Sequence, residues 1–170
     1  MSSRFTFSTF DVSRQVFYHT KLSYGVVNLK PIVPGHVLVV PRRVVKRLAD
    51  LTGEELTDMF DTVRRVGQVV EKAFQGESLT IALQDGPAAG QSVPHVHVHI
   101  LPRRFTDFGG RNDAVYPALE TNEAGLPGQL GAGAGKAADE KGRLRMDNDE
   151  REPRSMEEME KEADWLRGLF

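Results

Sequence analysis

Three histidines alternate with apolar residues at His95, His97 and His99, and they are the majority of the five histidines in the chain. Side chains two residues apart on a β-strand point to the same face, about 6.6–7 Å apart. The alternation therefore predicts a strand with three imidazoles on one face and Val96 and Val98 buried behind it. Three adjacent polar rings are costly to place on a strand without a use, so this strand is the candidate site.

Metal binding is one chemistry that such a strand offers, because neutral imidazole is a zinc ligand and a His-X-His pair supplies two ligands. A catalytic zinc site also needs a third ligand and groups that orient the rings. His36 and Asp85 are the candidates for that third ligand, and the triad segment itself contains no acidic residue.

Attack on a phosphoryl group is the other chemistry, since an imidazole nitrogen is unprotonated near neutral pH and can act as a nucleophile. We expect His97 to attack, with its second nitrogen fixed by a hydrogen bond. The loop before the strand could cradle the phosphate through backbone amides at Gly86 and Gly90, helped by the side chains of Gln91 and Ser92. This loop lacks the Gly-Lys-Ser/Thr ending of a P-loop.

The size and composition of the chain fit one ordinary globular domain, with 170 residues, 39% hydrophobic and 27% charged. A formal net charge of −2 provides no basic field for nucleic acid or a membrane surface. Cysteine is absent, which excludes disulfides and thiolate metal sites. We find neither a signal peptide nor an apolar run of about 20 residues, so we expect a cytoplasmic protein with access to the nucleus left open.

The patterns predict an α+β fold of several antiparallel strands around one long helix. Thr52 and Glu55 form a capping box, and apolar residues follow at helical spacing to about Phe74, so we expect a helix over 52–74. Short apolar and β-branched runs predict strands over 4–7, 16–19, 24–28, 36–40 and 79–83, in addition to the triad strand from His95. The strands 16–19 and 24–28 are expected to form a hairpin.

The organisation predicted along the chain is a core domain over 1–120, followed by two further segments. Residues 121–152 are rich in Gly, Ala and mixed charges, so we expect them to be disordered. Ser155 begins a second capping box, and an apolar stripe follows it. We therefore expect a terminal helix within 153–170 that docks on the domain.

Two of these segments resemble the signatures of the histidine-triad superfamily of nucleotide hydrolases and transferases. His95-Val96-His97-Val98-His99-Ile100-Leu101 is similar to the His-φ-His-φ-His-φ-φ motif, where φ is an apolar residue, and residues 34–41 resemble the second signature. The third triad position is histidine rather than the glutamine of the transferases. The chain most resembles the Fhit branch, through Leu83-Gln84-Asp85-Gly86-Pro87, Arg111-Asn112-Asp113 and Arg154-Ser155-Met156-Glu157-Glu158-Met159.

The resemblance implies a five-stranded antiparallel sheet with one long helix and a C-terminal helix, and a homodimer in which two sheets join. It also implies hydrolysis of diadenosine triphosphate to AMP and ADP by double displacement, with His97 transiently adenylylated. His95 would orient His97 through its backbone carbonyl, and His36 would pack behind the triad. His99 would hold the bridging or leaving oxygen and could supply it with a proton. A magnesium or manganese ion would be bound by the substrate phosphates. The resemblance implies no metal site formed by the protein itself and no tightly bound cofactor.

The resemblance further implies a set of substrate contacts along the chain. Asn28 matches the residue that contacts the ribose, and the apolar first strands would wall the adenine pocket. The implied phosphate-gripping residues are Gln84, Gly90, Gln91, Ser92, Val93 and His99.

Two alternatives to this hydrolase stay open on the residues alone. One is an AMP-phosphoramidase of the Hint branch, although that branch follows its triad with Gly-Gly and here Leu101-Pro102 follows. The other is a nucleotide-binding signalling module whose substrate complex, rather than its turnover, is the output. Pro94, directly before the triad, also departs from expectation, because it removes one N–H donor from the loop.

Overall fold

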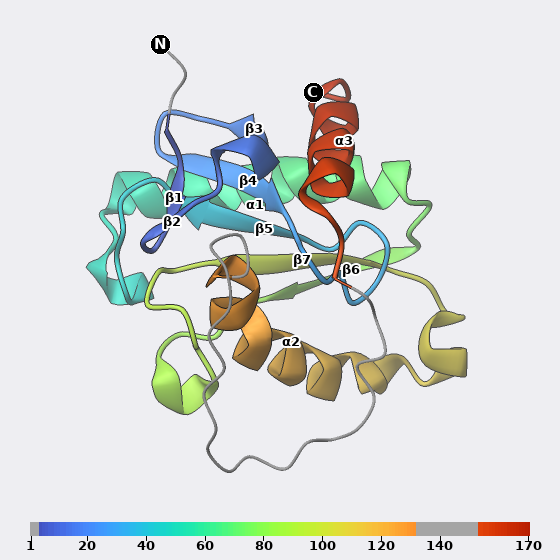
Figure 1. The fold of residues 1–170 in the computed structure, drawn as a ribbon. Coiled ribbons are helices and arrows are strands. Elements are labelled where there is room, and N and C mark those ends of the chain that lie inside the picture. Colours follow the sequence, from blue (N-terminus) through green and yellow to red (C-terminus); the bar gives the residue numbers. More distant parts are fainter. Residues whose placement is uncertain (1–3, 132–152) are drawn as a thin grey trace.

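The computed structural model describes residues 4–131 and 153–170 and contains a five-stranded sheet with helices on both sides (Figure 1). All neighbouring strands are antiparallel, in the order β3-β4-β5-β7-β6. The α+β prediction and the five-stranded sheet are therefore confirmed. The strands of this sheet are β3 (Val16–His19), β4 (Ser23–Val27), β5 (Val37–Pro41), β6 (Ser78–Ala82) and β7 (Val98–Arg103).

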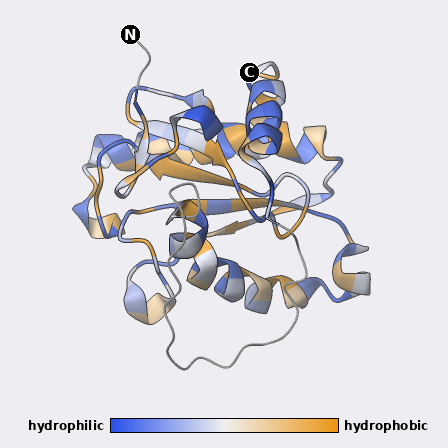
Figure 2. Cartoon of the chain, viewed as in Figure 1, coloured by the Kyte–Doolittle hydropathy of each residue, from blue (hydrophilic) through white to orange (hydrophobic). Residues whose placement is uncertain are grey.

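The sheet is buried on both faces, which Figure 2 shows as apolar strands in the middle of the molecule. Alternate residues of β5 point to opposite sides: Val37 and Val39 belong to one apolar cluster, and Leu38 and Val40 to another. The first cluster contains the apolar faces of helices α1 (Gly53–Ala73) and α3 (Met156–Arg167). Fully buried strands in the middle of a sheet are continuous apolar runs because both faces are covered.

The long helix α1 begins where its capping box predicts. The Thr52 hydroxyl accepts the Glu55 amide, and the Glu55 carboxylate accepts the Thr52 amide in return. Met59, Val63 and Val66 then face the sheet. Helix α3 has the same kind of cap at Ser155, and its apolar stripe packs into the same cluster.

Helix α2 (Val115–Gly131) lies against the opposite face of the sheet, where Leu126 packs on the cluster of Leu38 and Val40 (Figure 1). The expectation of disorder over 121–152 is therefore wrong for 121–131, and the helix also crosses the predicted end of the core domain at residue 120. Packing on the sheet stabilises a helix that the Gly-rich composition does not predict. The rest of that segment, 132–152, lies outside the described residues.

Two strand predictions also need correction. The strand expected over 4–7 is reduced to β1 (Thr6–Phe7), which pairs with β2 (Phe10–Asp11) in a separate small sheet. The triad strand begins at Val98 rather than His95, because the pairing of β7 with β5 extends only from Val98 to Ile100. No helix within the described ranges 4–131 and 153–170 is both long and apolar enough to span a membrane.

Short 3-10 helices connect several of these elements. They are η1 (Ser13–Gln15), η2 (Leu48–Asp50), η3 (Pro87–Ala89), η4 (Asp107–Gly110) and η5 (Asn112–Ala114).

Candidate active site

The three triad rings lie on one side of an extended segment that leads into β7. His95 and His97 precede the strand and His99 is inside it, yet Val96 and Val98 still point into the opposite cluster beneath α1. The amide of Val96 donates to Val45 O at 2.8 Å, which holds the segment extended before the sheet begins. The predicted division of faces is therefore present although the strand is shorter.

His95 is a buried, neutral ring. Its Nδ1 accepts the Ser8 amide at 2.9 Å, so its Nε2 carries the proton and donates to Pro41 O at 2.8 Å. Burial lowers the pKa of His95 from 6.5 to about 4, and the Pro41 carbonyl opposes that shift only in part. This ring is a support for the segment and does not face the site.

His97 is oriented by its predecessor. Its Nδ1 lies 2.7 Å from the backbone oxygen of His95, and a carbonyl can only accept, so Nδ1 carries a proton. This hydrogen bond turns the Nε2 of His97 towards the open side of the segment. The expectation that His95 orients His97 through its backbone carbonyl agrees with this contact.

His99 is oriented by a chain of hydrogen bonds that starts at a backbone amide. The Ile32 amide donates to Nδ1 of His36 at 3.1 Å, so His36 carries its proton on Nε2. That nitrogen lies 3.0 Å from Nδ1 of His99, which must accept. The Nε2 of His99 is therefore a donor, and burial lowers the pKa of this histidine, so the ring stays neutral. Asn28 lies beside His36, with its amide nitrogen 3.2 Å from His36 Nε2.

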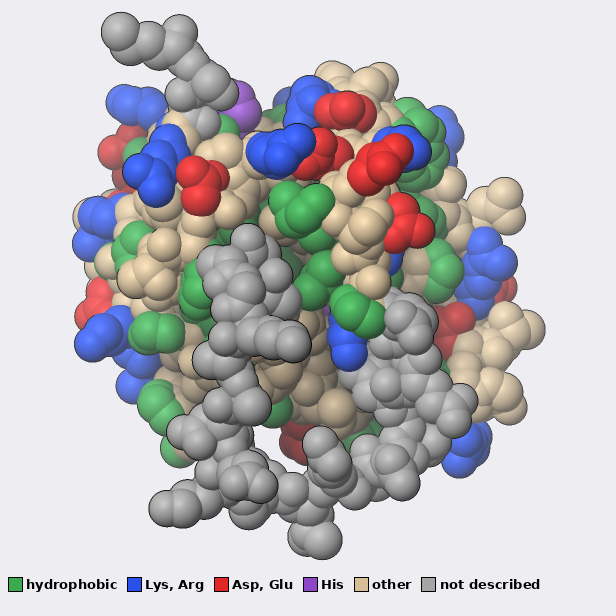
Figure 3. Space-filling model, in the orientation of Figure 1, with side chains coloured by type: hydrophobic (Ala, Val, Ile, Leu, Met, Phe, Trp, Pro, Cys, Tyr) green, Lys and Arg blue, Asp and Glu red, His purple; other side chains and the backbone are tan. Residues whose placement is uncertain are grey.

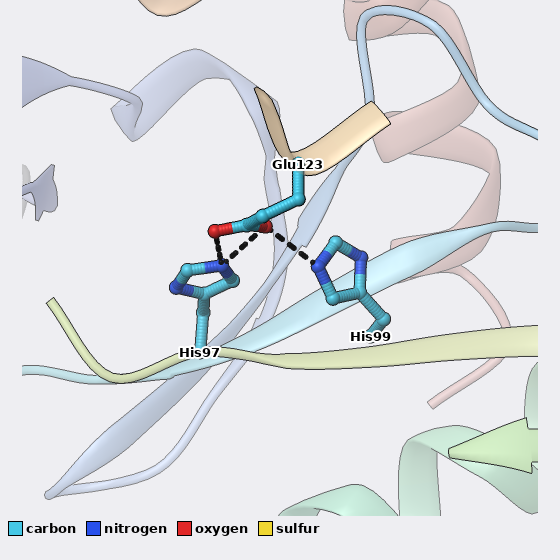
Figure 4. Close-up of side chains that lie close together, drawn as sticks. All are labelled: His97, His99 and Glu123. Carbon is cyan, nitrogen blue, oxygen red and sulfur yellow. Dashed lines mark hydrogen bonds and ion pairs between the residues drawn. The ribbon is translucent and has the colours of Figure 1, made fainter. Parts of the chain in front are cut away.

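A glutamate that the sequence did not single out completes the site. The carboxylate of Glu123, from α2, lies between the two outward-facing nitrogens, 2.9 Å from His97 Nε2 and 3.0 Å from His99 Nε2 (Figure 4). Burial alone would raise the pKa of Glu123, but the hydrogen bonds from His97 and His99 outweigh it and hold the pKa below its usual value. Glu123 is therefore ionised.

The loop before the triad contributes Ser92 to the same point. The Ser92 amide donates to Glu123 Oε1 at 3.0 Å, and its hydroxyl donates to the backbone oxygen of Glu123. Gln91 instead closes the loop on itself: its amide oxygen accepts the Gly86 N–H and its nitrogen donates to Lys46 O. Gln91 was expected to assist at the phosphate, but its side chain is engaged elsewhere.

The remaining predicted loop residues lie near Ser92 in different environments. Gly86 and Gly90 have φ of +103° and +94°, which glycine adopts readily, so the loop turns as its composition predicts. Val93 is buried in the cluster on the α2 side. Gln84 has a buried Oε1 that no donor reaches among the described residues. Asp85 pairs with Arg47 at 3.1 Å and so is not a third metal ligand.

A cavity of about 740 Å³ lies on the α2 side of the sheet. Phe7, Val26 and Leu38 form part of its apolar wall, and Asn28 and Arg154 are polar members of its lining. Arg154 donates to the Asn28 backbone oxygen and pairs with Glu162. This pocket matches the place where the sequence predicted a base-binding wall along the first strands.

The donor atoms of His97, His99 and Glu123 lie within 4.8 Å of one another, a set of two imidazoles and one carboxylate that occurs at catalytic zinc. In the portion of the chain that the structure describes, this is the one such group of potential ligands. The third member comes from α2, and neither His36 nor Asp85 takes that place.

A family model described as "HIT domain" matches residues 9–106, more than half of the chain. The chain belongs to the HIT domain family. The predicted superfamily is therefore confirmed, and its matched region ends before α2.

Individual HIT-domain relatives extend the likeness over the whole chain. A Schizosaccharomyces pombe protein named bis(5'-nucleosyl)-tetraphosphatase [asymmetrical] is 53% identical over 176 residues, covering 100% of this chain and 96% of the relative. An Arabidopsis thaliana protein named bifunctional bis(5'-adenosyl)-triphosphatase/adenylylsulfatase FHIT is 46% identical, covering 99% and 85%. The crystal structure of the Caenorhabditis elegans NitFhit protein aligns with a TM-score of 0.72 at 36% identity, covering 100% of this chain and 31% of that one. These relatives support the Fhit branch.

Proposed function

We propose that this HIT-domain protein hydrolyses dinucleoside polyphosphates and cleaves diadenosine triphosphate to AMP and ADP. The observation that carries the proposal is the fixed orientation of His97, whose Nδ1 proton is held by the His95 carbonyl. When the substrate replaces Glu123 in the site, the Nε2 of His97 faces the α-phosphorus. Names of relatives that are nucleoside tri- and tetraphosphatases support the substrate class.

In the proposed reaction the Nε2 of His97 attacks the α-phosphorus. A phosphorus–nitrogen bond forms and the bond to the bridging oxygen breaks, so ADP leaves and AMP is held on His97. Water then attacks the same phosphorus, and AMP leaves as the phosphorus–nitrogen bond breaks. Covalent attack through a histidine divides one displacement into two easier ones.

Preorganised donors would stabilise the charge that develops at the phosphate. Ser92 offers an amide and a hydroxyl, and His99 offers its Nε2 proton. The amide and the His99 ring already hold an anionic carboxylate, and the hydroxyl donates to the backbone oxygen of the same glutamate. Donors that need no reorganisation contribute strongly to phosphoryl-transfer catalysis. His36 acts through His99 and is a positioning residue.

The cavity on the α2 side is proposed as the site of the nucleoside. Asn28 would contact the ribose, while the apolar wall would take the base. The unpartnered oxygen of Gln84 would contact the phosphates only through a bridging cation or water, because both oxygens are acceptors. Gly90 and Val93 would donate to the phosphates through their backbone amides. The substrate is proposed to arrive with magnesium or manganese on its phosphates, which neutralises charge there.

The homodimer is also a proposal. Among the described strands β6 pairs only with β7, so its outer edge is unpaired there, and Ile81 is 49% exposed. Unpaired edges are surfaces on which another strand can add. We propose that two sheets join here, and light scattering of the purified chain tests it: a monomer at micromolar concentration would be evidence against it.

Charges of both signs are interspersed on the face in Figure 3, consistent with a cytoplasmic or nuclear protein that does not bind nucleic acid.

His97→Asn tests the reaction, with His19→Asn as the matched control because His19 is exposed and distant from the triad in sequence. We expect His97→Asn to lose at least a thousandfold in turnover of diadenosine triphosphate and His19→Asn to change little. Hydrolysis in ¹⁸O-water should label AMP and not ADP. Label in ADP, or full activity in His97→Asn, would refute the assignment. Turnover of an AMP–amine in preference to the dinucleotide would favour the phosphoramidase.

A further inference from the structure

Glu123 occupies the point where the proposed reaction needs a phosphate. Its carboxylate takes hydrogen bonds from His97 Nε2, His99 Nε2 and the Ser92 amide, at 2.9, 3.0 and 3.0 Å. These are the same three groups that the proposed reaction assigns to the phosphorus and its oxygens. Carboxylate and phosphate oxygens are both anionic acceptors, so one excludes the other.

The contact with Glu123 also blocks the nucleophile. Nδ1 of His97 donates to the His95 carbonyl, so Nε2 is the nitrogen that the proposed reaction directs at phosphorus. The Glu123 carboxylate lies 2.9 Å from that nitrogen and occupies the position from which a phosphorus atom would be attacked. In this arrangement His97 is covered.

The next turns of α2 cover the nucleoside cavity. Leu126 is buried in the cluster that contains Phe7, Val26 and Leu38, and Leu130 packs against the same cluster. Both leucines line the cavity. Positions 123, 126 and 130 lie on one face of a helix, so α2 presents a carboxylate followed by two apolar side chains over about 10 Å. That order, an anion and then an apolar group, is also the order of a nucleotide from phosphate to base.

Helix α2 has little stability of its own. Gly125, Pro127 and Gly128 lie within its span, and each of these residue types is unfavourable inside a helix. Pro127 also lacks the N–H that would close a turn. The helix is held by its contacts with the sheet and the triad, and a ligand that takes over those contacts would release it.

We propose that α2 is a built-in competitive inhibitor, in which Glu123 takes the place of the α-phosphate and Leu126 covers the nucleoside cavity, so that substrate must displace it. The inference rests on the proposed function for its account of the site. Binding of AMP is the probe, because it requires the same pocket whether or not the protein turns over a dinucleotide.

Glu123→Ala should bind AMP about tenfold more tightly in titration calorimetry of the full chain, the change expected from removing one charge-assisted competitor. KM for diadenosine triphosphate should fall by a similar factor while kcat stays within about twofold. The control is Glu120→Ala, an exposed glutamate on the same helix that should alter neither value. Unchanged AMP affinity in Glu123→Ala, or a large loss of kcat, would overturn the proposal.

Hydrogen exchange of the unmodified chain is a second measurement that does not depend on a variant folding. Saturating AMP should speed exchange of the amides within 115–131 while it protects the triad segment. Slower exchange across both regions would show that α2 closes on the nucleotide instead, and would overturn the inference. If AMP binds and releases α2 but no dinucleotide is cleaved, the inhibitor stands and the proposed hydrolysis fails.

Discussion

His95 should make the folded protein progressively less stable as the pH falls from about 6.5 to 4. The ring is fully buried, its Nδ1 accepts the Ser8 amide and its Nε2 donates to Pro41 O. Protonation of Nδ1 would leave the Ser8 N–H without its acceptor and place a charge in the apolar surroundings. The neutral form is therefore favoured in the native state.

The size of this loss of stability follows from the difference between the pKa of His95 in the native state and in the unfolded state. Burial lowers the native pKa of His95 to about 4, whereas an unfolded histidine has a pKa near 6.5. Between these values the unfolded chain binds more protons, so stability is fully present above pH 6.5 and declines below it. The total loss for this one group is about 3 kcal/mol at the low end of the window.

Urea unfolding of the parent and of His95→Gln, from pH 7 to pH 4, measures this difference. A glutamine amide can accept from Ser8 and donate to Pro41 O without titrating, but it fills the place of the ring less well, so the variant should be less stable at pH 7 by about 1–2 kcal/mol. The gap between parent and variant should then close or reverse as the pH falls, because only the parent loses the contribution of His95; other groups such as His99 titrate in both proteins. His19→Gln, at an exposed histidine, should follow the parent. A parallel decline of parent and His95→Gln would refute the reasoning.

Three further substitutions test the packing that positions the site. Glu55→Gln should lower the free energy of unfolding at pH 7 by about 1–2 kcal/mol, since the hydrogen bond from Arg43 lowers the pKa of Glu55 to about 2. The stability that ionised Glu55 contributes is present above pH 4.5 and is lost towards pH 2, and a variant as stable as the parent at pH 7 would contradict this account. Gly35→Ala should cost about 2–4 kcal/mol in urea, because φ is +81° and a Cβ would overlap the Phe74 ring; an unchanged midpoint would show that the ring yields. Met159→Ala should cost about 2–4 kcal/mol and lower the thermal midpoint, and full retention would mean that α3 does not support the core.

The faces of the triad segment could be predicted from its alternation alone, because burying Val96 and Val98 fixes which way the intervening rings point. The start of the strand could not. The start of the strand depends on which residues β5 pairs with. His99 lies opposite Leu38 of β5, whereas no described strand pairs with the chain at His95. Likewise, the link from His36 to His99 arises from the adjacency of β5 and β7, which no local pattern contains.

Glu123 was missed for a related reason. Val115, Leu119 and Leu126 recur at helical spacing and are the one signal that could have revealed α2. The glycines and proline around Leu126 mask that signal, because intrinsic propensity there disfavours a helix. The helix forms through contact with the sheet, and such contacts become visible only when the fold is known.

The hydrogen-bond chain behind His99 has a consequence for leaving-group departure. The chain begins at the Ile32 amide, which is not an acid that gives up its proton, and the rings of His36 and His99 that follow are both neutral. If His99 gave up the hydrogen on its Nε2, replacing that proton through its Nδ1 would take the proton from His36 Nε2 and convert His36 to an imidazolate, which is unfavourable. His99 therefore grips an oxygen as a permanent donor and is ill suited to acid catalysis, so departing ADP must leave as an anion or draw its proton from solvent.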